Sequence, residues 1–341
     1  MFFSPLISKS ESVSAIMLKV LLALLPGIAL YVWYFGPAVL VSIALASITA
    51  LVTEALMLKL RNRPVIPFLK DNSALLTAWL LALSIPPLAP WWLVVVGTAF
   101  AIAIAKHLYG GLGNNMFNPA MVGYAVLIIS FPAQMTHWVA PHGLSLSGLG
   151  FLQQLDYIFL GVLPDQTALD ALTMATPLDT LKTHLHLDQP IAQILDMPIY
   201  GHLAGHGSEM VAAGFLLGGV YLLYSRIISW HIPVAYLGTL FVIASMFHLA
   251  DPAHYAGPLF HWFAGAAMLG AFFILTDPVS SPTTNKGRLI FAGGAALLTY
   301  LIRVFGGFPD GVAFATLLMN ICVPLIVLYT QPPVFGKKDK S

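Results

Sequence analysis

Charged side chains are scarce in this chain of 341 residues: lysine, arginine, aspartate and glutamate together make up 9%, whereas 58% of the residues are hydrophobic. So few polar groups cannot cover the surface of a water-soluble domain, and the mean hydropathy of +0.85 agrees. The sequence also lacks a basic stripe interleaved with aromatic residues, so no nucleic-acid partner is expected. We therefore expect a polytopic membrane protein.

Cysteine is almost absent. Cys322, the single cysteine, lies in an apolar run, so the chain has no disulfide framework, no cysteine zinc site and no set of four thiolates for an iron–sulfur cluster. It also lacks the Gly-x-Gly-x-x-Gly fingerprint of a dinucleotide-binding fold. If electrons pass through this chain, a flavin must carry them.

Apolar windows separated by charges, glycine and proline predict an all-α chain with about ten membrane-spanning helices. The expected spans are residues 20–35, 38–58, 73–89, 91–109, 114–131, 209–225, 232–249, 255–275, 288–305 and 311–330. Several are close to the lower limit of about 17 residues, which leaves broken or re-entrant elements open for the second and third spans and for the fourth and fifth. Lys19 leads into an apolar segment without a small-residue cleavage site, so we interpret this segment as a membrane helix rather than a signal peptide.

The basic residues predict the orientation. If both termini are cytoplasmic, thirteen of the fifteen lysines and arginines fall on the cytoplasmic side, as the positive-inside rule requires. The thirteen are Lys9, Lys19, Lys59, Arg61, Arg63, Lys70, Lys106, Arg226, Lys286, Arg288, Lys337, Lys338 and Lys340. Only Lys182 and Arg303 then lie on the outer side, and an error in the number of spans in either half would remove this asymmetry.

A faint internal repeat divides the chain. Residues 83–87, ahead of Gly110-Gly111, resemble residues 275–279, ahead of Gly306-Gly307. Each half has five expected spans, an odd number, so the halves are expected to be two inverted repeats. The predicted division is a first membrane repeat at 1–131, a periplasmic loop at 132–208, a second membrane repeat at 209–330 and a cytoplasmic tail at 331–341.

The long polar loop contains the run Asp170-Ala171-Leu172-Thr173-Met174-Ala175-Thr176. Thr176 has small neighbours, and Pro177 favours an extended backbone before it, so its hydroxyl is predicted to be accessible to a bulky group. A second interpretation is structural, because Thr176 followed by Pro177 and Asp179 is also typical of a helix N-cap.

This run resembles the flavin attachment site in the D-type membrane subunit of Rnf-type ion-translocating electron-transfer complexes and in its sodium-pumping quinone reductase relative. The runs at residues 110–120 and 275–285 resemble the same family. The resemblance implies that FMN is esterified through its 5′-phosphate to Thr176. Related attachment sites usually have glycine where this chain has Met174.

The same resemblance implies a bacterial inner-membrane flavoprotein in a complex that moves electrons between ferredoxin and NAD and couples them to Na⁺ or H⁺ translocation. It implies partner subunits of the A, B, C, E and G types, which would hold the NAD and iron–sulfur sites, and it allows a second, non-covalent riboflavin-like flavin. No catalytic side chain is expected in this chain itself. The alternatives are the B-type subunit of a sodium-translocating NADH:quinone reductase and a flavin-free inverted-repeat transporter or channel.

Asn114, Asn115, Asn118 and Pro119 form a polar break at the beginning of the fifth expected span, and Asp277 lies in a similar cluster after the eighth. One interpretation is a helix cap with a satisfied turn. The other is a broken helix that lines the electron or ion route. The resemblance favours the second for the general region.

Glu54 lies near the end of the second expected span. An ionisable group inside a membrane segment is costly unless it is paired or hydrated, so a buried Glu54 would be a candidate for cation or proton handling. The alternative is that Glu54 extends to the inner interface beside Lys59.

His248, His254 and His261 surround Asp251 in the sequence, but their spacing matches no standard ligand pattern. We interpret them as interfacial histidines, and no metal site is expected.

Overall fold

The computed structural model describes residues 12–144, 148–164 and 169–331. The basic residues of the two chain ends and nearly all of the expected cytoplasmic tail lie outside this range; they are Lys9, Lys337, Lys338, Lys340 and residues 332–341.

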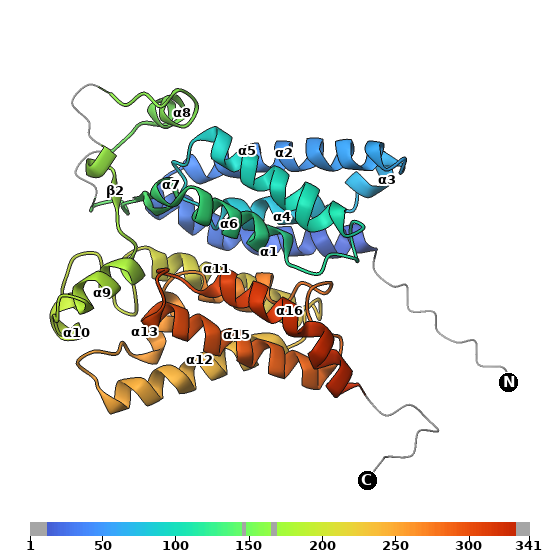
Figure 1. Cartoon of the computed structure of the whole chain (residues 1–341). Helices are drawn as coiled ribbons and strands as arrows, with labels where there is room; N and C mark the ends of the chain where they lie inside the picture. The colour runs from blue at the N-terminus through green and yellow to red at the C-terminus, as the bar shows by residue number, and fades with distance from the viewer. Residues whose placement is uncertain (1–11, 145–147, 165–168, 332–341) are drawn as a thin grey trace, which may run out of the picture.

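Two groups of helices run side by side along one axis, the first coloured blue to green and the second yellow to red (Figure 1). The first group contains α1 (Val13–Phe35), α2 (Ala38–Leu60), α3 (Val65–Leu69), α4 (Ser73–Ala82), α5 (Trp91–Phe100), the π-helix η1 (Ala101–Leu108) that continues α5, and α6 (Pro119–Ser130). The second contains α11 (Ser208–Tyr224), α12 (His231–Ala250), α13 (Pro258–Phe263), α14 (Ala267–Leu269), the π-helix η3 (Gly270–Ile274), α15 (Asn285–Phe305) and α16 (Val312–Thr330).

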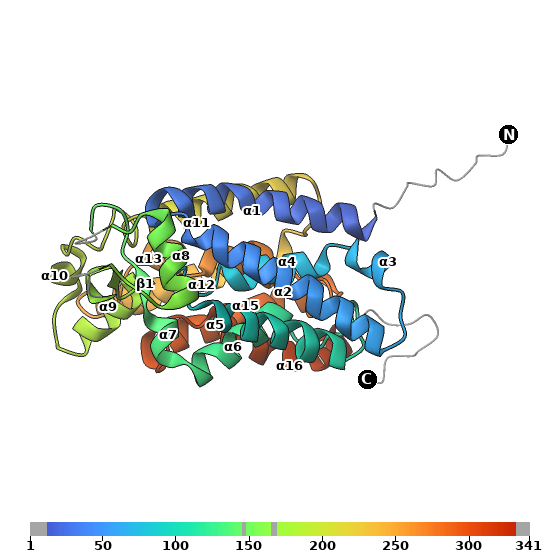
Figure 2. The same cartoon turned by 90° about the horizontal axis from the view of Figure 1, so that it is seen from above.

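The segment between the two groups forms a cap at one end of the bundle (Figures 1 and 2). Its elements are α7 (Pro132–Thr136), β1 (Trp138–Val139), α8 (Phe151–Leu160), the 3₁₀ turn η2 (Leu169–Ala171), β2 (Thr173–Met174), α9 (Pro177–Leu185) and α10 (Ile191–Leu195). β1 and β2 pair antiparallel, with Trp138 opposite Met174 and Val139 opposite Thr173. The described residues are mostly helical, as expected, and this short ribbon is a local exception to the expected all-α fold.

Six helices of the described residues are long and apolar enough to cross a bilayer: α1, α2, α5 with η1, α12, α15 and α16. Three further apolar helices, α4, α6 and α11, are shorter. The chain is thus a multi-pass membrane protein that is mostly helical. Ten spans and an inverted repeat remain predictions.

Two expected spans are interrupted. The helix expected over 73–89 ends at Ala82, because Pro86, Pro87 and Pro90 lack the N–H groups that would continue it. The helix expected over 255–275 breaks between α13 and α14, where Gly265 has a φ of +61°, a left-handed conformation that favours glycine. The break in the third span falls in one of the two pairs of spans for which the sequence had left a broken element open, whereas the break in the eighth span was not expected.

The two helix groups meet most closely where α1 packs along α11, and α6 contacts α16. Small residues make the first contact possible, because a Cβ at Gly214 would lie 2.8 Å from the Cα of Gly27 and one at Gly218 would collide with the Ala23 carbonyl oxygen. This spacing of small residues four apart brings two membrane helices into backbone contact. One apolar core consequently extends through both groups.

Candidate functional site

Thr176 is the N-cap of α9. Its Oγ1 accepts a hydrogen bond of 3.2 Å from the Asp179 N–H, and Pro177 is the first helical residue. The capping interpretation is therefore correct as a description of the backbone. The cap does not exclude attachment of a bulky group, because the Thr176 side chain is only half-buried and Ala175 beside it is exposed.

Thr176 also lines a cavity of about 200 Å³ between the two helix groups, which we call the outer cavity. The β1–β2 ribbon and the beginning of α9 contribute one side of it, and the ends of helices from both groups contribute the rest. Its aromatic lining residues are Tyr31, Phe35, Tyr124, Trp138 and Phe215. A planar aromatic group can stack on or against such walls.

Neighbouring contacts fix the backbone around Thr176. The Tyr200 hydroxyl donates to the Pro177 carbonyl at 3.0 Å. Glu209, which is buried at the beginning of α11, accepts the N–H groups of Leu203 at 2.8 Å and Ala204 at 3.0 Å. These bonds close the loop that packs on α9, so that Thr176 is held from the side of the second helix group.

Lys182 and Arg303, the two basic residues expected on the outer side, both bind backbone carbonyls. Lys182 on α9 donates to the carbonyls of Gly306 and, at 2.9 Å, of Phe308, just beyond the C-terminal end of α15. A cation is favourable at a helix C-terminus. Burial lowers the pKa of Lys182, and the Asp179 carboxylate opposes this shift. Lys182 thus connects α9, the helix that Thr176 caps, to the second helix group.

Arg303 is buried and makes three kinds of contact. Its guanidinium donates to the Asp310 carboxylate at 3.0 Å, to the His261 carbonyl at 2.7 Å and to the Ala264 carbonyl at 3.0 Å. The same Asp310 accepts the Ala266 N–H at 2.7 Å. Arg303 and Asp310 together satisfy backbone groups that the break between α13 and α14 frees, and Asp310 lines the outer cavity.

A second cavity of about 120 Å³, the inner cavity, lies toward the other end of the bundle and is also lined from both helix groups. Its polar lining residues include Lys106, Asn115, Asn118 and Asp277. The sequence had singled out three of these four residues. It had treated Lys106 only as a cytoplasmic charge.

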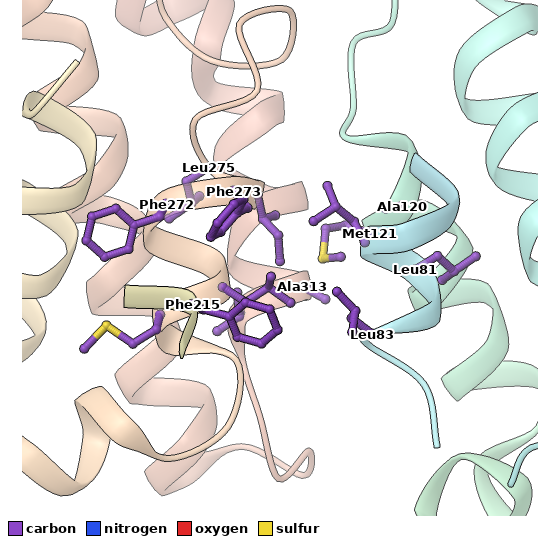
Figure 3. Packing of buried hydrophobic residues seen from close by; sticks show 14 of the residues in the cluster. Leu81, Leu83, Ala120, Met121, Phe215, Phe272, Phe273, Leu275 and Ala313 are labelled. Atoms are coloured by element: carbon purple, nitrogen blue, oxygen red, sulfur yellow. The ribbon is translucent and has the colours of Figure 1, made fainter. Parts of the chain in front are cut away.

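A thin apolar layer separates the two cavities. Met121 and Phe215 line the outer cavity, whereas Ala120 and Phe273 line the inner one. The rings of Phe215 and Phe273 meet edge to face, with 6.1 Å between their centroids. Figure 3 shows these two side chains directed toward Met121 of the first helix group. Ala120 and Met121, which are neighbours in the sequence, thus line different cavities.

Glu54 does not extend toward Lys59. It is 2% exposed and pairs with Lys106, whose Nζ lies 2.7 and 2.8 Å from the two carboxylate oxygens. Lys106 Nζ also donates to Ser73 Oγ at 2.8 Å, and His107 Nε2 lies 3.3 Å from Glu54 Oε1. Arg61 donates to His107 Nδ1 at 3.2 Å, which leaves Nε2 as the protonated nitrogen facing the carboxylate. Glu54 is therefore a buried, neutralised carboxylate.

Asn118 joins the two helix groups. Its Oδ1 caps α6 by accepting the Met121 N–H at 3.3 Å, and its Nδ2 donates to the Ile274 carbonyl at 3.2 Å. The Asn118 N–H donates to Asn320 Oδ1 at 3.0 Å, and Asn320 Nδ2 donates to the Ser280 carbonyl at 2.9 Å. The capping interpretation of Asn118 is thus confirmed. Asn118 also lines the inner cavity, and a role in the electron or ion route stays a prediction.

Residues 1–336 match the NQR2, RnfD, RnfE family. The chain belongs to this family. A protein of Shigella dysenteriae serotype 1 (strain Sd197) is 54% identical over 98% of this chain and 97% of its own length, and proteins of Escherichia coli (strain SMS-3-5 / SECEC) and Escherichia fergusonii match to the same extent. Each of these three relatives is named as the D subunit of an ion-translocating oxidoreductase complex.

In this member of the NQR2, RnfD, RnfE family, no three His, Cys, Asp or Glu side chains of the described residues gather as metal ligands. His254 pairs with Asp251 at 2.8 Å on the surface, and the hydrogen bond from this histidine lowers the pKa of Asp251. His261 is instead buried against Tyr300, with 5.0 Å between the ring centroids.

The sequence interpretation missed three polar residues of this family member: Lys106, Asn320 and Asp310. The sequence did contain a signal for Lys106 and Asn320, because each lies inside an apolar segment, where a polar or ionisable side chain indicates a partner or a cavity. Asp310 offered no such signal, since it lies in a turn between two helices.

Proposed function

We propose that this chain is the flavin-carrying membrane subunit of an ion-translocating oxidoreductase complex, with FMN joined through its 5′-phosphate to Thr176. Family membership and relatives named as the D subunit of such a complex support its place in an assembly of this class. They favour that assignment over the B-type subunit of a quinone reductase. The observation that carries the flavin proposal is that the Thr176 side chain lines the aromatic outer cavity.

The residues around Thr176 fit a flavin phosphate. A phosphoester at this position would lie at the N-terminus of α9, where the helix dipole and free N–H groups favour negative charge. The aromatic walls of the outer cavity would orient the ring system, and the apolar layer beneath it would keep water from the ring. Once bound, the flavin supplies the electron chemistry, while the protein determines its position.

The test of this proposal is in-gel fluorescence. The chain made with its flavin transferase should give a fluorescent band on a denaturing gel under ultraviolet light, because a covalent flavin survives the detergent. Thr176→Val should abolish the fluorescence and electron transfer while leaving membrane insertion intact.

Thr173→Val is the matched control. Thr173 belongs to the same run, but its hydroxyl donates to the Leu169 carbonyl at 3.1 Å. The control should keep its fluorescence. A band that stays dark in the parent chain despite an active transferase, or that fluoresces in Thr176→Val, would move the flavin-free transporter to first place.

We infer a second flavin site in the inner cavity, for a non-covalent riboflavin-like molecule. Its position next to the outer cavity, separated by the Phe215–Phe273 layer, supports it. Acid extraction of the purified complex should release free riboflavin in addition to the attached FMN, and Phe273→Trp, which fills the inner cavity, should reduce only the extractable flavin. Unchanged extractable riboflavin in Phe273→Trp would place this flavin elsewhere.

For the coupling to Na⁺ or H⁺, we propose that Asp277 contributes more than Glu54. Asp277 lines the inner cavity and accepts only neutral donors, Val279 N–H at 3.3 Å and Ser280 Oγ at 2.7 Å. Glu54 is already neutralised by Lys106. Asp277→Asn should reduce ion uptake by membranes carrying the whole complex by more than Glu54→Gln does; the reverse order would contradict the ranking.

We further propose ten spans in two inverted repeats, in the bacterial inner membrane, with both termini cytoplasmic and residues 132–208 periplasmic. The beginning of α1 and the end of α16 lie at the end of the bundle opposite to α9 and α10, which supports this arrangement (Figure 1). Alkaline phosphatase should be active when fused at Asp156 and inactive when fused after Lys338. Activity at Lys338 would overturn the topology.

A further inference from the structure

α8 is a short helix of ten residues that stands outside both helix groups. In Figure 1 it is seen nearly end-on, and in Figure 2 it runs across the bundle, so its axis is roughly perpendicular to the long helices. Since the long helices cross the membrane, α8 lies approximately parallel to the membrane plane.

The packing of α8 against α2 determines its depth relative to the membrane. Ile158 is 2% exposed and packs against Ala38, in the first turn of α2, and against Leu88. α2 spans 23 residues, about 34 Å at 1.5 Å per residue, which is close to the thickness of a bilayer core. Its first turn therefore lies at the membrane surface, and so does α8.

Away from Ile158, the surface of α8 is apolar on one side and more polar on the next. At about 100° per residue, Phe151, Leu152, Leu155 and Phe159 fall within one arc of the helix; we call them the apolar edge. Leu152 is 73% exposed and Phe151 is 50% exposed. Beyond Leu152 around the helix lie the exposed Asp156, Leu160 and Gln153, of which Gln153 is the farthest from the centre of the apolar edge.

The apolar edge continues a lipid-facing surface. On α2, Leu40, Ile48, Val52 and Leu56 are exposed at helical spacing and form a stripe along the bundle. Leu40, the first member of this stripe, belongs to the turn of α2 against which α8 packs. An amphipathic helix in the membrane plane, with one apolar and one polar side, inserts the apolar side into the lipid.

We propose that α8 is an interfacial helix whose apolar edge enters the outer lipid leaflet and anchors the cap to the membrane. This goes beyond the proposed flavin function, since it holds whether or not Thr176 is modified. It has a consequence for the outer cavity: Val139 of β1 packs beside Ile158 of α8, and β1 pairs with β2, which ends two residues before Thr176. The anchor therefore sets the height of Thr176 above the lipid.

The test compares two neighbouring positions. In a Cys322→Ser background, Leu152→Cys and Gln153→Cys are labelled separately with an environment-sensitive fluorophore, and the purified complex is placed in phospholipid nanodiscs. Leu152 and Gln153 are adjacent but lie on the apolar and polar sides, so each is the control for the other.

We expect quenching by spin-labelled lipid to be several-fold greater at position 152 than at 153, and quenching by aqueous iodide to show the opposite order. Equal iodide quenching at both positions would overturn the proposal, because the edge would then be in water. Lipid quenching at 152 that is present in the isolated full chain but lost in the complex would also overturn it, because a partner protein of the complex would then cover the edge.

Discussion

Lys106 in the first helix group and Arg303 in the second occupy matching places. Each is buried two residues before the end of its long helix, η1 or α15. Each reaches the beginning of a short, interrupted helix: Lys106 bonds to Ser73, the first residue of α4, and Arg303 bonds to the carbonyl of Ala264 at the break before α14. A long helix in each group thus holds, near its end, a cation that supports a broken element.

The two cations differ because their partners differ. Ser73 offers a side chain and Glu54 a carboxylate, and an ammonium with three donors is enough for both. The break at Gly265 leaves the carbonyls of two different residues in addition to Asp310, and the forked guanidinium binds them through Nη1, Nη2 and Nε respectively. Each cation therefore meets three acceptor atoms, but those of Lys106 all bind one nitrogen, whereas those of Arg303 bind three different nitrogens.

The largest effect is expected for Arg303→Met. It leaves Asp310 buried without a cation and frees the carbonyls of His261 and Ala264, so the free energy of unfolding should fall by about 3–5 kcal/mol. Denaturant unfolding of the purified chain in detergent micelles measures it. Arg303→Lys should recover only part of the loss. If this lysine variant is as stable as the parent chain, the forked donor geometry of the guanidinium is not what the break requires.

Lys106→Met should cost less, about 3 kcal/mol, because His107 still faces the Glu54 carboxylate. The double variant Lys106→Met/Glu54→Gln should regain part of this stability, since no unpaired charge then remains in the core. The same unfolding measurement, arranged as a double-mutant cycle, provides the interaction free energy. Additive losses would show that the two residues do not act as a pair.

The smallest effect concerns the contact between the halves. A methyl group at Gly218 would meet the backbone of α1, so Gly218→Ala should destabilise the chain by about 1–3 kcal/mol. Gly238→Ala on α12 is the matched control, because a Cβ there meets nothing within 4 Å; it should be neutral or slightly stabilising. Equal stability of the two variants would indicate that α1 and α11 separate without cost.

Much of the helix order follows from local sequence. Apolar runs locate α1, α2, α12, α15 and α16 to within a few residues, except that α1 begins seven residues earlier than expected, at Val13. Local chemistry also predicts caps, as at Asn118 and Thr176. The breaks were harder to predict: Pro86 and Pro87 end α4 early, and the break at Gly265 had no proline to mark it.

The sequence by itself determined that this is a membrane protein and where most of its helices lie, because hydropathy, capping and turn chemistry act between residues close in the chain. The candidate flavin acceptor, Thr176, came from the resemblance of its run to a family. Only the tertiary structure decided which groups meet. Glu54 and Lys106 are 52 positions apart, and Asn118 and Asn320 are 202 apart. These partners are brought together by helix packing, which depends on shape complementarity over whole surfaces and leaves no local pattern. The same packing placed the side chain of Thr176 at a cavity between two helix groups.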